Sequence, residues 1–182
     1  MENYKKVLLT LAGFLAFHTI FKQRNNIKGS VMSLPINRIK KIITQQEIID
    51  ALQKVKKVYG ETIAKYVEQI YRVETAHFKS SQFLYTYSAG MLKFKDKYPY
   101  GWGNFKTFWA VNPSYAPTNF YKIFVSRENK DFYYLGFNSL EAAMMTLAYY
   151  VNKNGRLRWN STLAKEQAIY QKALNSVINR YV

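Results

Sequence analysis

Glu74 is the carboxylate whose position in the chain best suits acid catalysis. It lies near the end of a run, residues 61–78, in which apolar side chains recur at helical spacing. At about 100° per residue, Glu74 falls roughly 20° from Val67 and roughly 40° from Ile70, on the apolar side of that helix. Partial burial disfavours an ionised carboxylate and raises its pKa. A carboxylic acid that stays protonated near neutral pH can protonate the leaving oxygen of a glycosidic bond.

The other charged residues near Glu74 on this helix are expected to face away from the core. Around the helix axis, Glu68 lies about 120° from Glu74, Arg72 about 160° and Lys65 about 180°. A second interpretation stays open, in which Glu74 reaches water at a frayed helix end or forms an ion pair with Lys79 or Arg72. The two interpretations differ in whether the carboxyl is partly buried.

Two helices are predicted around this position. Thr44-Gln45-Gln46-Glu47 has the pattern of a capping box, and apolar residues follow it at helical spacing up to Tyr59. Gly60 suits the position that ends this first helix. The second helix is predicted over residues 61–78. Its apolar stripe consists of Ile63, Tyr66, Val67, Ile70 and Val73.

The rest of the chain predicts more helix and one small β-hairpin. Residues 79–120 lack sustained periodicity, which is typical of an irregular or short-helical region, whereas 121–125 and 131–135 are β-prone runs joined by a short polar turn. Ser139 is placed to cap a helix that Asn154-Gly155 ends, and a last helix spans Tyr170 to Tyr181. The predicted fold class is mainly α (α+β): a helical domain over residues 44–182 with one hairpin.

The N-terminal residues form a separate predicted segment. Residues 7–21 carry no Asp, Glu, Lys or Arg, and basic residues flank them on both sides. At about 1.5 Å per residue they span roughly 22 Å, and snorkelling lysines extend the reach toward the ~30 Å of a bilayer core. We expect a membrane helix at residues 1–21 and a basic linker at 22–43. A cleaved signal, or an amphipathic or buried helix, are the alternatives.

Composition points to an anionic partner and away from cysteine or metal chemistry. Lys and Arg number 27 against 11 Asp and Glu, a formal net charge of +16. Such a balance favours a polyanion as partner: nucleic acid, a membrane surface or a bacterial wall. The chain has no cysteine, and its two histidines are His18 and His77. We therefore expect no disulfide, no metal centre and no cofactor.

The sequence around Glu74 resembles a family of wall-degrading enzymes. Val73-Glu74-Thr75-Ala76-His77-Phe78 is similar to the Glu-Ser-x-Phe neighbourhood of lysozyme-like lytic transglycosylases and bacterial glucosaminidases, and Tyr87-Ser88-Ala89-Gly90 to the Ser-x-Ala-Gly stretch of the transglycosylases. Phe137–Ala142 and the segment from Tyr170 to Ile178 look like the last two helices of the glucosaminidases. The resemblance spans about 61–182. It implies a lysozyme-like fold with Glu74 as general acid.

The chain also departs from these families. Phe137 stands where the glucosaminidases have Tyr, the Gly-rich stretch after the catalytic Glu is absent, and Asn104-Phe105 is a weak echo of their Asn-Asn-x-Phe-Gly motif. A second acid is expected on the hairpin, where Asp131 and Glu128 are the candidates, with Asp96 a third. Alternatively, Glu128 and Asp131 are solvated residues of the hairpin turn. Glu74 then acts alone, as the resemblance to transglycosylases implies, and leaves an anhydro-sugar end.

The aromatic residues between Tyr98 and Tyr121 suggest a sugar-binding wall, because aromatic rings combine an apolar face with a polar tip. We expect Phe105, Phe108 and Trp109 to lie in the core. The predicted substrate-binding residues are Tyr98, Tyr100, Trp102, Ser88, Asn104 and Tyr134.

The leading expectation is a membrane-tethered, glucosaminidase-like glycoside hydrolase that cuts peptidoglycan strands. It would face the periplasm or cell wall, as an autolysin or as a phage or virion-associated lysin. The alternatives are a lytic transglycosylase, a non-catalytic membrane-anchored structural protein and a basic nucleic-acid binder. Scattered basic residues and the lack of a nucleic-acid module argue against the last of these. Expected partners are the glycan strands and, through the N-terminal segment, a membrane.

Overall fold

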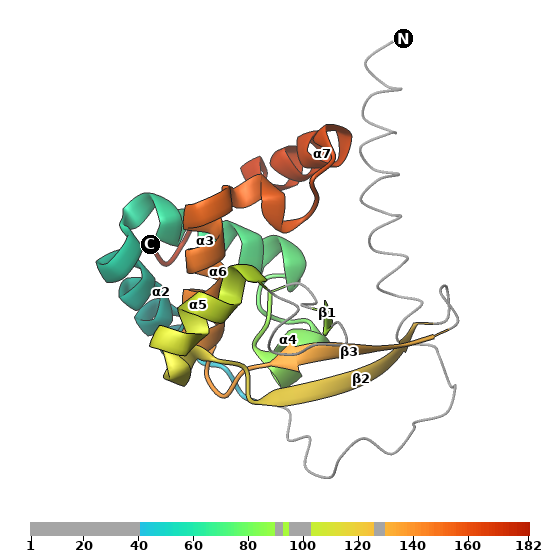
Figure 1. The fold of residues 1–182 in the computed structure, drawn as a ribbon. Coiled ribbons are helices and arrows are strands. Elements are labelled where there is room, and N and C mark those ends of the chain that lie inside the picture. The colour runs from blue at the N-terminus through green and yellow to red at the C-terminus, as the bar shows by residue number, and fades with distance from the viewer. Residues whose placement is uncertain (1–40, 90–92, 95–102, 126–129) are drawn as a thin grey trace. The chain divides into compact units, whose positions relative to one another are not determined.

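The computed structural model describes residues 41–89, 93–94, 103–125 and 130–182, which belong to one compact unit (Figure 1). This part of the chain is mainly helical, as predicted. The predicted anchor at residues 1–21 and residues 22–40 of the predicted linker lie outside the described residues. Within the described ranges, no helix combines the length and the apolar character needed to cross a membrane.

The capping box predicted at Thr44 is present and begins helix α2, Gln45–Tyr59. The Thr44 hydroxyl accepts a hydrogen bond from the Glu47 backbone N–H (3.2 Å), and the Glu47 carboxylate accepts one from the Thr44 N–H (2.7 Å). Gly60 ends α2 and begins α3, Glu61–Glu74, with a φ of 87° that favours glycine. The local signals at these helix ends were therefore predicted correctly.

Helix α6, Leu140–Asn154, is the central helix of the core. Ser139 caps its N-terminus as predicted, accepting from the Ala142 N–H at 3.1 Å, and Gly155 ends it. Its apolar residues at helical spacing are buried, and the burial extends around the helix to Ala142, Met145 and Thr146. Helices α2 and α3 and the shorter helix α5, Gly103–Val111, pack against it (Figure 1). A helix that is apolar nearly all round is a buried one.

Both strands of the predicted hairpin are present, slightly longer than expected. Strand β2, Asn119–Val125, pairs antiparallel with β3, Lys130–Gly136, in a register that places Phe124 opposite Asp131. A two-residue strand that the sequence did not predict, β1 (Lys93–Phe94), pairs with the other edge of β3. The resulting sheet has the order β1-β3-β2 (Figure 1).

The segment predicted to be irregular or short-helical contains α4 (Ser81–Thr86), α5 and a 3-10 turn at Pro113–Tyr115. After α6 come a second 3-10 turn, η3 (Arg156–Trp159), and α7, Ala164–Asn175. The prediction of a last helix up to Tyr181 was wrong at its end, because the chain leaves the helix at Ser176. There the Ser176 hydroxyl donates to the Ala173 carbonyl (2.8 Å), and the remaining residues return to α3.

Candidate active site

Glu74 is the last residue of α3 and is partly exposed to solvent. Burial of its carboxyl raises the pKa, as the apolar position on the helix predicted. Neither of the cations proposed as alternative partners pairs with it within the described residues, since Arg72 is bound to Glu68. Glu74 thus has the environment of an acid that holds its proton to a higher pH than an ordinary carboxyl.

Tyr170 of α7 lies against this carboxyl. Its ring is buried, with 6% of the residue exposed. Burial raises the pKa of Tyr170, and the neighbouring Glu74 carboxylate raises it further; in return the hydroxyl partly lowers the pKa of Glu74. The contact departs from standard hydrogen-bond geometry, and the Tyr170 hydroxyl has no other hydrogen-bond partner among the described residues. The two groups are therefore in contact without a hydrogen bond of standard geometry.

A left-handed turn follows directly after Glu74, so the prediction that α3 continues to residue 78 was wrong. Ala76, His77 and Phe78 have φ values of 49°, 57° and 67°. The His77 N–H donates to the Arg72 carbonyl (2.9 Å), which is the six-to-one bond of a Schellman motif. Glycine usually occupies the first left-handed position of this motif. Because Ala76 stands there instead, the sequence carried no stop signal.

The hydroxyl of Thr75 stabilises this turn from inside. Thr75 is buried; its hydroxyl donates to the Tyr71 carbonyl and accepts from the Phe78 N–H at 2.9 Å. Successive left-handed residues other than glycine cost free energy, and such strain is common beside functional groups. A small hydroxyl residue after the acid therefore determines where the helix ends and how Glu74 is presented.

Aromatic packing ties the turn to the strap of residues 86–89. Phe78 stacks on Tyr71 with ring centroids 5.8 Å apart, and the Tyr71 hydroxyl donates to the Tyr87 carbonyl at 2.9 Å. Ser88, a predicted substrate-binding residue, is 8% exposed in this strap, and its backbone N–H donates to the Thr86 hydroxyl (3.1 Å). The stretch that resembles the transglycosylase Ser-x-Ala-Gly motif is thus attached to α3 one turn before Glu74.

Glu68 and Arg72 are buried, contrary to the prediction that they face away from the core. Glu68 is 0% exposed and accepts from the Arg72 Nε at 2.8 Å. Its carboxylate also accepts from the backbone N–H groups of Arg180 (2.8 Å) and Tyr181 (3.2 Å), and the Arg72 guanidinium lies 4.7 Å from the Tyr181 ring centre. The C-terminal segment covers this face of α3, which periodicity within one helix does not reveal.

The remaining predicted site residues are only partly described. Asp131 and Tyr134 lie in β3, where Tyr134 pairs with Lys93 of β1 and Tyr121 of β2. Asn104 is the second residue of α5. The other predicted residues lie outside the described residues: Glu128, Asp96, Tyr98, Tyr100 and Trp102.

The aromatic residues assigned to the core are confirmed there. Phe105 is 0% exposed and stacks on Trp109 at 5.1 Å, and Phe108 stacks on Tyr149 at 4.6 Å. The Trp109 indole N–H donates to the Thr146 hydroxyl (3.1 Å), so this buried donor is satisfied. These rings fix α5 against α6.

Glu74 and Tyr170 form the candidate active site: a carboxyl of raised pKa beside a buried hydroxyl. Within the described ranges, no three His, Cys, Asp or Glu side chains come together as metal ligands. Sequence reasoning named Tyr170 only for its helix, because its contact with Glu74 depends on how α7 packs against α3. Comparison with known proteins adds no relative: no family model matches the chain, and neither the curated proteins nor the solved structures give a match.

Proposed function

We propose that this chain is a peptidoglycan glycosidase in which Glu74 is the general acid. The observation that carries the proposal is the partly buried Glu74 carboxyl, whose pKa is raised by burial at the exposed end of a helix. In the protonated form, Glu74 gives its proton to the glycosidic oxygen as the bond to the anomeric carbon breaks. The departing sugar then leaves as a neutral alcohol.

Tyr170 has a positioning role in this proposal. A hydroxyl beside the carboxyl restricts its rotamers and completes a hydrogen bond when the substrate arrives. Catalytic hydrogen bonds are commonly long or misaligned without substrate, and the incomplete Glu74–Tyr170 geometry agrees with this behaviour. The strained turn after Glu74 fits the same role, because strain of this kind is frequent where a group must be held in place.

Two routes complete the reaction. In a hydrolase, a second carboxylate either activates water or forms a glycosyl-enzyme intermediate, and Asp131 and Glu128 are the proposed residues. In a lytic transglycosylase, Glu74 takes back a proton from the sugar's own hydroxyl and an anhydro end forms. The attachment of the 86–89 strap to Tyr71 supports the second route, because that strap carries the transglycosylase-like sequence.

The N-terminal segment and the net charge of +16 complete the proposal. We propose that residues 1–21 anchor the enzyme in a membrane, so that it faces the periplasm or wall or is carried in a virion. A strongly basic surface holds such an enzyme to anionic wall polymers. A non-catalytic wall-binding protein would share this charge but would not need Glu74.

Zymography on purified peptidoglycan tests the proposal. The full-length chain should clear the substrate, and Glu74→Gln should not, with unchanged circular dichroism. Glu61→Gln is the matched control, because it makes the same chemical change at an exposed position of α3 and should still clear. Clearing by Glu74→Gln would remove the proposal. Mass analysis of the fragments then separates reducing ends from anhydro ends.

A further inference from the structure

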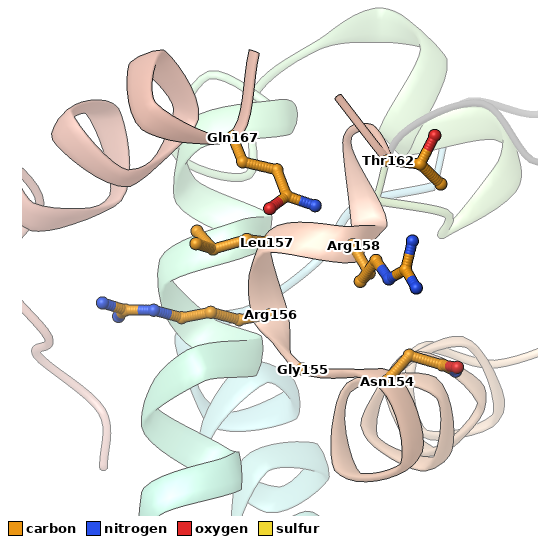
Figure 2. A pocket seen from close by; sticks show the side chains of 7 residues that line it. All are labelled: Asn154, Gly155, Arg156, Leu157, Arg158, Thr162 and Gln167. Carbon is orange, nitrogen blue, oxygen red and sulfur yellow. The ribbon is translucent and has the colours of Figure 1, made fainter. Parts of the chain in front are cut away.

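A pocket of about 360 Å³ lies at the end of α6, along η3 and beside the start of α7 (Figure 2). Its lining does not include Glu74 or Tyr170, so it is a separate feature of the surface. The polar residues that line it are Asn154, Arg156, Arg158, Thr162 and Gln167.

Two guanidinium groups flank this pocket, and they differ in how they are held. Arg156 donates to the Gln69 side-chain oxygen (2.7 Å) and to that of Asn175 (3.2 Å), and it lies 4.5 Å from the Tyr66 ring centre. Arg158 is exposed, and no carboxylate pairs with it within the described residues. Figure 2 shows the two side chains pointing to opposite sides of η3. Arg156 therefore stabilises one side of the pocket, and the exposed Arg158 guanidinium can bind a ligand.

The amide side chains of the pocket are oriented by their own hydrogen bonds. The Asn154 amide nitrogen donates to the Tyr150 carbonyl (3.1 Å), and the Gln167 amide nitrogen donates to the Ser161 carbonyl (2.8 Å). Their oxygens are consequently the groups left to accept hydrogen bonds from a ligand. The pocket thus offers a planar cationic donor at Arg158 and neutral acceptors around it.

The pocket is connected to both helices that carry the candidate active site. Gln167 lies three residues before Tyr170 in α7, and positions three apart share one helix face. Arg156 is tied to Gln69, which lies five residues before Glu74 in α3. The pocket therefore shares helix α7 with Tyr170 of the candidate active site.

We propose that this pocket binds a free carboxylate of the peptide stem of peptidoglycan, with Arg158 as its main contact. The identity of the ligand rests on the proposed function. A planar guanidinium matches a carboxylate in a two-pronged arrangement. The amide oxygens of Asn154 and Gln167 can accept hydrogen bonds from the N–H groups of the peptide that carries such a carboxylate.

Binding is tested in the full-length Glu74→Gln chain, which removes turnover. The probes are a disaccharide tetrapeptide with free carboxylates, the same compound with its carboxylates amidated, and the peptide-free disaccharide. Adding Arg158→Gln should weaken binding of the first probe about tenfold or more, since a charge-assisted hydrogen bond is lost. It should leave the amidated probe unchanged. Arg158→Lys keeps the positive charge but lacks the planar guanidinium, so its affinity should lie between those of Arg158→Gln and the parent chain.

Lys172→Gln is the matched control, because it removes one positive charge from an exposed position of α7 outside the pocket. It should change affinity for the first probe less than twofold. Equal losses in Arg158→Gln and Lys172→Gln, equal affinity for the free and amidated probes, or no binding of the first probe would each overturn the proposal. Zymography with Glu74 intact tests the hydrolase separately, so either idea can fail while the other stands.

Discussion

The Tyr170 hydroxyl lies against the Glu74 carboxyl where α7 packs on α3, and two opposing effects act on the carboxyl there. Burial raises its pKa, and the hydroxyl partly offsets that rise. The hydroxyl itself is buried without a partner of standard geometry among the described residues. The variants Tyr170→Phe and Glu74→Gln separate these two effects.

Tyr170→Phe should move the alkaline limb of the pH–activity profile to higher pH. The hydroxyl lowers the pKa of Glu74, so its removal lets that pKa rise and keeps the acid protonated over a wider range. The measurement is the initial rate of wall lysis against pH. The variant keeps the buried ring of Tyr170 and removes only its hydroxyl, and circular dichroism checks that the fold is unchanged. Tyr149→Phe is the control, and a limb that stays in place or moves to lower pH contradicts the prediction.

Glu74→Gln should be more stable than the native chain at pH 7. The folded-state pKa of Glu74 lies above its unfolded value, so the native protein loses stability as pH rises from about 4 through the folded pKa. Gln imitates the protonated acid and avoids this loss. Urea unfolding at several pH values measures the effect, which should vanish below about pH 4. A less stable variant at pH 7 would show that the carboxylate supports the fold instead.

Glu61→Gln should change the stability at pH 7 in the opposite direction, and it serves as the internal control. The hydrogen bonds and charges of Lys65 and Lys56 lower the pKa of Glu61 to about 2. Its folded pKa is thus below the unfolded value, and its small stabilising effect is present above pH 4 and is lost as pH falls toward about 2. Both salt bridges are exposed, so the change should be slight.

Thr75→Val should destabilise the fold by about 1–3 kcal/mol, because it leaves the Phe78 N–H buried without its acceptor. Val keeps the branched shape and removes only the hydroxyl. Thr75→Ser keeps the hydroxyl and should retain most of the stability. Denaturant unfolding measures both variants. In lysis assays, Thr75→Val should lose more activity than its loss of folded protein explains, because the turn positions Glu74. Equal activity and stability of Thr75→Val and Thr75→Ser would contradict this role of the hydroxyl.

Glu68→Gln should cost about 3–5 kcal/mol, because it leaves the buried Arg72 without its counter-charge. It should also loosen the C-terminal segment, since the Glu68 carboxylate accepts from the Arg180 and Tyr181 N–H groups. Amide hydrogen exchange at those two residues measures the loosening. If their exchange is unchanged, another contact holds the segment.

Lysis of whole walls should fall sharply with ionic strength, whereas cleavage of short soluble muropeptides should change little. The net charge of +16 acts on the wall as a whole, and salt screens such exposed charges beyond roughly 10 Å. A short fragment depends mainly on contacts at the site itself. The comparison uses one enzyme preparation over a sodium chloride series. An equal salt response of both substrates would contradict an electrostatic hold on the wall.

The local features of this protein could be predicted from neighbouring residues in the sequence. Thr44 with Glu47, Gly60, Ser139 and Gly155 marked real helix ends, because caps are made by groups within a few residues. The β-prone runs became β2 and β3, and the apolar spacing correctly placed Glu74 on a partly buried face. Each of these features depends on neighbours in the chain.

The way in which those parts combine depends on packing between distant segments. Glu68 is buried because backbone groups 112 and 113 positions away cover it, and Tyr170 meets Glu74 because α7 packs on α3. Periodicity cannot reveal either contact, since a helical wheel reports one face and not the segment that covers it. The early end of helix α3 could be predicted only in part. The Thr75 hydroxyl that bonds to the turn is a local feature, but Ala76 occupies the left-handed position where glycine would have indicated a helix end.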